Sequence, residues 1–327
     1  MSQYIINIDG LKKEFKVHKR TESGVLSALK SIIHREYNIV TAVKDLDLKV
    51  KPGEIRGLIG PNGAGKSTTI KILSGILYPS EGTVDVMGYT PWSQREEYVK
   101  KIGVVFGQKS QLWWDLPAID TFALNKQMYC IPNDLFQRNV EYFSELLSIS
   151  DVITKPVRQL SLGERMKCEF VCALLHEPPL VYLDEPTIGL DIISKEAIRS
   201  FIKKVNKDKG MTFIVTTHDL SDIEDLCENV SIINNGTIVF NDSIDKLKGY
   251  FSDKKIIEVK FSKHIDESLL SGFKVISSDP FHANFEIETV GTNLQDEISR
   301  IFHNLPVQDI NVNNINIEEV IKYIYKA

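Results

Sequence analysis

The sequence predicts an α/β fold with a mainly parallel sheet, followed by a small α+β domain. Between residues 54 and 240, short apolar runs typical of buried strands alternate with longer runs of helical spacing. Strands that alternate with helices favour parallel pairing, because each helix returns the chain across one face of the sheet. A change of pattern near Lys248–Lys255, beyond which short strands dominate, predicts domains at residues 1–248 and 249–327.

The elements of the first domain are predicted from apolar periodicity and turn residues. Residues 4–8 have a strand pattern, and residues 41–50 alternate as a half-buried strand does. Pro52-Gly53 then turns the chain into a short apolar strand at Glu54–Ile59. Further strands are predicted at residues 83–87, 102–106, 180–183, 212–216, 230–233 and 237–240, and helices at 67–77, 192–209 and 220–227.

Residues 118–175 show no strand-like alternation and predict a largely helical region that Pro132 and Pro156 divide. In the second domain, strands are predicted at residues 256–261, 273–277, 285–290 and 307–312. A capping-box sequence beginning at Thr292 predicts a helix that ends near Phe302, and another beginning at Asn316 predicts a last helix.

A basic amphipathic segment precedes the first domain's core. Apolar residues recur at helical spacing from Val25 to Ile33, and the predicted helix ends near Tyr37. Two interpretations stay open: the helix packs on its own domain, or its face touches a membrane partner or the headgroup surface.

Composition excludes several classes of protein. The chain has 327 residues, 43% hydrophobic and 25% charged, which is typical of globular proteins. No stretch approaches the ~18 uncharged apolar residues of a membrane span, and the N-terminus lacks an apolar signal core. Four cysteines without a metal-binding pattern suggest reduced thiols in a cytoplasmic chain. The net charge of −5 argues against a generally basic nucleic-acid binder.

One motif dominates the chain. Residues 60–68 match G-x-x-x-x-G-K-[ST] between a predicted strand and a predicted helix: Gly60, Pro61, Asn62, Gly63, Ala64, Gly65, Lys66, Ser67 and Thr68. Glycines let the backbone curl so that its N–H groups converge on phosphate oxygens, and the helix directs its positive N-terminus at the same anion. Lys66 would reach the β- and γ-phosphates, and Ser67 would hold Mg²⁺.

A second motif supplies acids. The apolar strand at residues 180–183 ends in Asp184 and Glu185. Asp184 would hold Mg²⁺ through water beside Ser67, and Glu185 would orient or deprotonate the attacking water.

These motifs, together with Leu160–Arg165, resemble the ATP-binding cassette family, whose signature reads Leu-Ser-Gly-Gly-Gln. The resemblance covers about residues 4–245. It extends to Gln108 after a strand, to Gly189-Leu190-Asp191, and to His218 after another strand. Tyr37 lies 29 residues before Lys66, where the family usually keeps an aromatic residue stacked on adenine.

The resemblance implies a cassette with a mainly parallel core sheet, an antiparallel β subdomain and a helical subdomain at about residues 110–175. It implies ATP and Mg²⁺ as ligands, with Ser67, Gln108 and Asp184 at the metal. Catalytic roles fall to Glu185, His218 and Gln108, and ATP contacts to Tyr37, residues 60–68, Ser161, Gly163 and Asp191. His176 fits no motif and is interpreted as structural.

The signature departs from the family's pattern at two positions. Leu162 replaces its first glycine and puts a side chain where close approach to ATP is needed. Glu164 replaces its glutamine and adds negative charge near an anion, which is expected to weaken binding unless the carboxylate points away.

In this family, the signature of one subunit completes the ATP site of another. One phosphate loop and one signature therefore imply a head-to-tail pair with a second copy or a paralogous cassette. Integral membrane permease subunits are the other expected partners, at the cytoplasmic face of the cell membrane, and no nucleic acid is expected. Trp113 and Trp114 suit an anchor for such a subunit, or else lie buried in the helical subdomain.

A single cassette with a small tail resembles the ATPase subunits of ABC-2 type exporters. Two alternatives stay open: a soluble cassette ATPase acting on ribosomes or DNA, and an ATP-dependent switch without transport.

Overall fold

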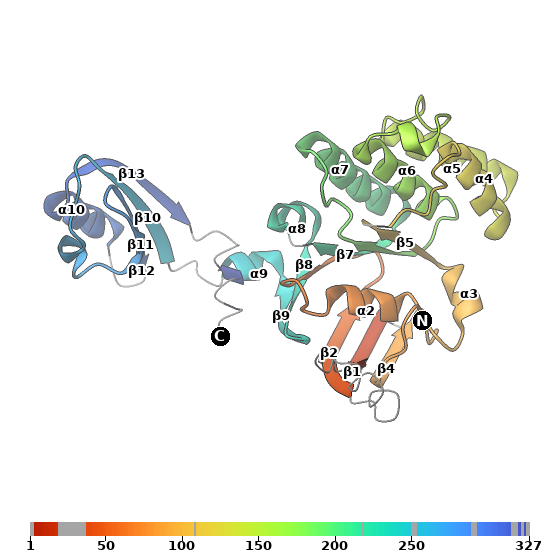
Figure 1. The fold of residues 1–327 in the computed structure, drawn as a ribbon, viewed down its shortest axis with the longest axis horizontal. Helices are drawn as coiled ribbons and strands as arrows, with labels where there is room; N and C mark the ends of the chain where they lie inside the picture. The colour runs from red at the N-terminus through yellow and green to blue at the C-terminus, as the bar shows by residue number, and fades with distance from the viewer. Residues whose placement is uncertain are drawn as a thin grey trace, which may run out of the picture. The chain divides into compact units, whose positions relative to one another are not determined.

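The computed structural model describes residues 3–18, 37–107, 109–217, 219–249, 254–288 and 293–314, together with residues 320, 321 and 324. The chain divides into two compact units, Met1–Asn241 and Asp242–Ala327 (Figure 1). The division falls before the helix α9 (Ile244–Gly249), whereas the sequence pattern predicts a boundary after residue 248.

The first unit is built on a nine-stranded sheet in the order β4-β1-β2-β9-β8-β3-β7-β6-β5. Strand β3 pairs in parallel with β7 and β8, and β6 pairs in parallel with β5 and β7, whereas β1 is antiparallel to β2 and β4. The expected parallel core with an antiparallel part is thereby confirmed. The strands span β1 Ile6–His18, β2 Tyr37–Val50, β3 Ile55–Ile59, β4 Glu81–Val86, β5 Ile102–Phe106, β6 Leu180–Asp184, β7 Thr212–Thr217, β8 Asn229–Asn234 and β9 Thr237–Ser243.

Helices cover this sheet and form a separate helical layer (Figure 1). Helix α2 (Lys66–Leu73) contacts both β2 and β6, and α6 (Leu162–Leu174) packs on β5 and contacts α4, α5 and α7. The remaining helices of the unit are α3 Arg95–Val99, α4 Ala118–Met128, α5 Asn133–Leu146, the 3₁₀ turn η1 Val157–Gln159, α7 Ile192–Lys209 and α8 Leu220–Leu226. None of the helices in the described ranges is both long enough and apolar enough to cross a membrane.

The core of the first unit joins the antiparallel and parallel parts of the sheet. Apolar side chains of β1, β2 and β4 meet those of β3 and β6 around helix α2. The buried hydroxyl of Tyr98 donates to the carbonyl of Leu73 at 2.5 Å and lies 2.9 Å from that of Tyr182. Burial raises the pKa of both phenols, so they stay neutral. Their hydrogen bonds connect Leu73 at the end of α2 with Tyr182 on β6.

The N-terminal strands differ most from the expectation. Strand β1 continues to His18, well past the predicted residues 4–8, because it pairs with β2 along its whole length. Tyr37 begins β2 and does not end a helix, so that part of the prediction is wrong. The rest of the predicted amphipathic helix, at residues 25–36, lies outside the described residues.

The second unit holds a four-stranded antiparallel sheet in the order β11-β12-β10-β13. Its strands and helix bury a separate apolar core that includes Ile257, Phe285 and Ile301. The elements are β10 Lys254–Phe261, the 3₁₀ turn η2 Glu267–Leu270, β11 Val275–Ser278, β12 His282–Glu288, α10 Leu294–Asn304 and β13 Val307–Asn314. The capping sequence predicted at residues 316–319 lies outside the described residues.

Because each unit has its own core, a chain that ends at Gly249 is expected to fold and to keep the basal ATP hydrolysis that the family resemblance implies. Thermal unfolding followed by circular dichroism, with a phosphate-release assay, measures both properties. An insoluble or inactive fragment would show instead that residues 250–327 complete the first unit.

Candidate nucleotide site

The loop at residues 60–65 follows the central strand β3, all of whose residues are buried. Two glycines of the loop are required by close backbone approaches. A Cβ on Gly60 would lie 2.4 Å from the carbonyl oxygen of Ile233, and one on Gly65 would lie 2.6 Å from that of Ala42. Gly65 also has a φ of 112°, which side-chain-bearing residues rarely adopt. The loop is thus wedged between β2 and the end of β8.

Lys66 points back into this loop. Its Nζ donates to the carbonyl oxygens of Gly60 at 2.6 Å and Pro61 at 3.2 Å, and the residue is only 5% exposed. Burial lowers the pKa of the ammonium, while Glu185 and Asp184 act in the opposite direction. A buried cation beside the N-terminus of α2 gives this loop the electrostatics of an anion site.

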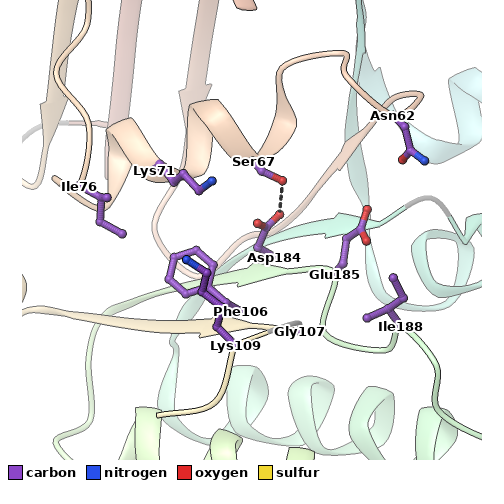
Figure 2. Close-up of a pocket in the computed structure, with 10 residues that line it drawn as sticks. All are labelled: Asn62, Ser67, Lys71, Ile76, Phe106, Gly107, Lys109, Asp184, Glu185 and Ile188. Carbon is purple, nitrogen blue, oxygen red and sulfur yellow. Dashed lines mark hydrogen bonds between the residues drawn. The ribbon is translucent and has the colours of Figure 1, made fainter.

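Ser67 and Asp184 contact each other in the wall of a cavity of about 580 Å³ (Figure 2). The Ser67 hydroxyl donates to Oδ1 of Asp184 at 3.0 Å, and the Thr216 hydroxyl donates to the same oxygen at 2.6 Å. A hydroxyl and a carboxylate in contact are hard oxygen ligands of the kind that Mg²⁺ prefers, so these residues fit that ion. The cavity is lined by Asn62, Ser67, Lys71, Ile76, Phe106, Gly107, Lys109, Asp184, Glu185 and Ile188.

Glu185 lines the same cavity with an unusual backbone. Its φ is 53°, in the left-handed region, and its N–H donates to the carbonyl and the hydroxyl of Thr216 at 3.0 and 3.1 Å. A Cβ on Gly107 would lie 2.0 Å from the carbonyl oxygen of Glu185. Such a conformation costs on the order of 1 kcal/mol and persists only where neighbours hold it, which is typical of functional sites.

Two predicted site residues, Gln108 and His218, lie outside the described residues. Their neighbours do not: Gly107 and Lys109 line the cavity, and Asp219 caps helix α8. Lys195 pairs with Asp219 at 2.5 Å. Burial opposes ionisation of Asp219, but Lys195 and Ser221 outweigh it and lower its pKa to about 2.

The signature serine caps its own helix. The Ser161 side chain accepts from the N–H of Glu164 at 3.2 Å, while the Ser161 N–H and hydroxyl donate to the Glu164 carboxylate at 2.8 and 2.9 Å. These hydrogen bonds lower the pKa of Glu164. Glu164 therefore forms a capping box with Ser161, as a glutamine could at the same position, and it adds a negative charge at the N-terminus of α6.

The other signature residues pack against the start of α7. A Cβ on Gly163 would lie 2.3 Å from Oγ of Ser194, so a side chain here would have to displace that hydroxyl from Asp191. Asp191 caps α7 by accepting from the N–H and hydroxyl of Ser194 at 2.9 and 2.7 Å. Leu162 lies beside Gly189 and is 38% exposed. None of the described signature residues lines the cavity at Ser67. A single chain therefore does not bring its signature, residues 160–165, to the cavity beside its own phosphate loop.

Strand register separates Tyr37 from the phosphate loop. Lys13 pairs with Val43 and Phe15 with Val40, so a bulge at Ala42 sets Lys13, Phe15 and Val43 on one face. Val43 is the residue on that face that approaches Gly65. Tyr37, opposite His18, is on the other face, and neither Tyr37 nor Phe15 is among the residues that line the cavity. Phe15 is thus on the face that approaches the loop, although sequence spacing did not single it out.

Trp113 and Trp114 are exposed by 57% and 55%, so the interpretation that they are buried in the helical subdomain is wrong. The Arg165 guanidinium lies over the Trp114 ring at 5.7 Å. Two adjacent exposed tryptophans are unusual on the surface of a single chain and suit an interface.

The comparisons with known proteins agree with this geometry. The family described as "ABC transporter" matches residues 43–188. The ABC transporter ATP-binding protein NatA of Bacillus subtilis is 30% identical over 64% of this chain and 85% of its own length. The linearmycin resistance ATP-binding protein LnrL of the same organism is 30% identical over 83% of this chain and 85% of its own.

Among solved structures, cbiO1 of Clostridium perfringens, described as part of an ABC transporter complex, superimposes with a TM-score of 0.61 and 25% identity. The match covers 76% of this chain and 92% of that one. With the phosphate loop, the acidic strand end and relatives matched over most of their length, this chain belongs to the ATP-binding, ATP-hydrolysing subunits of ABC transporters.

Proposed function

We propose that this chain drives export across a membrane by closing on ATP with a second cassette and reopening after hydrolysis. The observation that carries the proposal is the separation of the two motifs. Ser67, Asp184 and Glu185 line one cavity, and Lys66 directly precedes Ser67, whereas Ser161 and Gly163 contribute nothing to its lining. A second copy or a paralogous cassette, placed head to tail, supplies those groups to the γ-phosphate.

Within one site, the chain's own residues have separable roles. Lys66 exchanges its contacts with the loop carbonyls for the β- and γ-phosphates, which are better partners for a buried cation. Ser67 and Asp184 hold Mg²⁺, which when bound neutralises charge on the phosphates. Glu185, fixed by Thr216 and Gly107, accepts a proton from the attacking water. Gln108 and His218 remain candidates for orienting that water and the γ-phosphate.

The contacts of Glu164 at the signature helix account for a closed pair that is less stable after hydrolysis. The signature helix presents its N-terminus to the partner's γ-phosphate, but the Glu164 carboxylate already accepts from Ser161 there. A phosphate must compete with the Glu164 carboxylate for the hydrogen-bond donors of Ser161. The triphosphate of ATP carries more charge than the diphosphate of ADP, so it is the better competitor and favours closure. Because ATP binds the closed pair more tightly than ADP does, it drives a change between two states.

Membrane permease subunits are the proposed partners, at the cytoplasmic face of the membrane. The exposed Trp113 and Trp114 suit the docking of such a subunit. Export, as against import, is supported by the resistance protein LnrL, which matches 83% of this chain, whereas a methionine import protein of Enterococcus faecalis matches 71% at the same 30% identity. Co-purification of the chain from membranes, with identification of what accompanies it, tests this part of the proposal. A chain found only with ribosomes or DNA would overturn it.

Substituting Lys66→Ala is expected to weaken ATP binding at least about 100-fold, since a buried charge-assisted contact is worth about 3 kcal/mol. Isothermal titration calorimetry with ATP measures the dissociation constant. The matched substitution Lys207→Ala removes an exposed lysine of α7 that does not line the cavity, and it is expected to have a much smaller effect. Equal affinities of Lys66→Ala and the wild type would remove the lysine from the phosphate site.

Substituting Glu185→Gln is expected to keep ATP binding but to lower turnover by about 10²–10⁴-fold, the usual contribution of a general base. The stalled chain is then expected to accumulate as an ATP-dependent pair in size-exclusion chromatography with light scattering. A Glu185→Gln chain that hydrolyses ATP at the wild-type rate would exclude this residue as the base. A chain that stays monomeric with its cassette partner present would contradict the head-to-tail site.

Phe15 is proposed in place of Tyr37 as the aromatic contact of adenine. Phe15→Ala is expected to raise the dissociation constant for ATP by about tenfold, within the 1–3 kcal/mol typical of base–aromatic stacking. Tyr37→Ala, on the opposite face of the ribbon, is expected to change it less than about twofold. Titration of a fluorescent ATP analogue compares the two variants, and the reverse order would restore the original assignment.

A further inference from the structure

Glu169 is a buried acid to which the proposed mechanism gives no role. It lies in α6, eight residues after Ser161, and is only 3% exposed. In the part of the chain that the structure describes, its carboxylate forms no ion pair with a lysine, arginine or histidine. A buried carboxylate without a cation costs several kcal/mol unless hydrogen bonds compensate it, so its partners deserve a functional explanation.

Those partners all belong to one short segment. The Ser110 hydroxyl donates to Oε1 of Glu169, and the N–H of Gln111 lies 3.1 and 3.2 Å from its two carboxylate oxygens. The Gln111 side-chain amide donates to the backbone carbonyl of Glu169 at 3.4 Å. Ser110 is in turn fixed by the N–H of Leu112 at 3.1 Å. Burial raises the pKa of Glu169, and these donors act against it.

The segment that binds Glu169, residues 110–112, directly follows a residue that lines the nucleotide cavity. Lys109, which lines the cavity with Ser67 and Asp184, directly precedes Ser110. At the other end of the link, Glu169 belongs to the helix that starts with the signature residues. Helix α6 also lies directly on β5, since a Cβ on Gly103 would lie 2.7 Å from the carbonyl oxygen of Ala173. The carboxylate therefore ties the cavity wall to the helix that serves the opposite site.

We propose that Glu169 is a positioning residue that couples the two nucleotide sites of the pair. It holds the segment after Gln108 against α6, so a shift of that segment towards a bound nucleotide moves the signature helix with it. The inference rests on the proposed head-to-tail function. The proposed role requires a carboxylate at position 169, because both carboxylate oxygens accept from the N–H of Gln111. A glutamine there would offer one acceptor oxygen and an unwanted N–H donor.

The test compares Glu169→Gln with Ser110→Ala, which removes one donor and keeps the acid. Both are expected to bind a fluorescent ATP analogue within about twofold of the wild type, because neither touches the phosphate loop. Both are expected to lower kcat, by about tenfold for Glu169→Gln and less for Ser110→Ala, the range for a charge-assisted hydrogen bond. In a Glu185→Gln background, Glu169→Gln is expected to weaken the ATP-dependent pair by a similar factor.

Controls separate the possible outcomes. Glu196→Gln removes an exposed acid from α7 and is expected to leave kcat and pairing unchanged. Circular dichroism establishes folding, and if Glu169→Gln does not fold, Ser110→Ala decides. Equal kcat and equal pairing of wild type and the folded variants would overturn the coupling. If the Glu185→Gln chain does not pair in the presence of ATP, the head-to-tail proposal itself is wrong. That result differs from a loss of pairing that appears only when Glu169→Gln is added.

Discussion

The hydrogen bond from Ser67 to Asp184 connects two parts of the chain that the sequence separates by 117 residues. It joins the first turn of α2 to the end of β6, and Thr216 on β7 donates to the same carboxylate oxygen. Every other feature of the site is arranged around this contact: the loop that precedes Ser67, the acid that follows Asp184, and the cavity between them. The parallel order β3-β7-β6 makes the contact possible, because the carboxyl ends of these strands lie at one edge of the sheet.

Local patterns were enough to predict most of this site. The phosphate loop, the acidic strand end and the signature are each continuous in sequence, and their flanking strands and helices have clear periodicity. The capping box also had a signal, since Ser161 and Glu164 fit the S-x-x-E spacing. What the spacing left open is where the charge of Glu164 points: it was expected to weaken ATP binding unless the carboxylate points away, and in the structure the carboxylate accepts from its own helix terminus.

The choice between Tyr37 and Phe15 for the adenine contact depends on strand register. Tyr37 was chosen by its distance of 29 residues from Lys66, which takes no account of how β1 and β2 pair. Both strands extend much further, and a bulge at Ala42 changes which face each residue occupies. Register between distant strands depends on pairing that no single segment encodes, so counting could not find Phe15. The left-handed backbone of Glu185 was hidden for the same reason, because Thr216 and Gly107 hold it from other strands.

The long pairing of β1 with β2 also makes the chain suitable for engineering. His18 and Tyr37 are opposite each other in the ladder, so the stretch between them starts and finishes at neighbouring points. Lengthening such a connection costs little, roughly 0.6 kcal/mol for each doubling, when its ends are already held together. A fluorescent reporter or affinity tag inserted there is expected to leave the register at Ala42 and the phosphate loop in place. This position offers a labelling site for following the subunit.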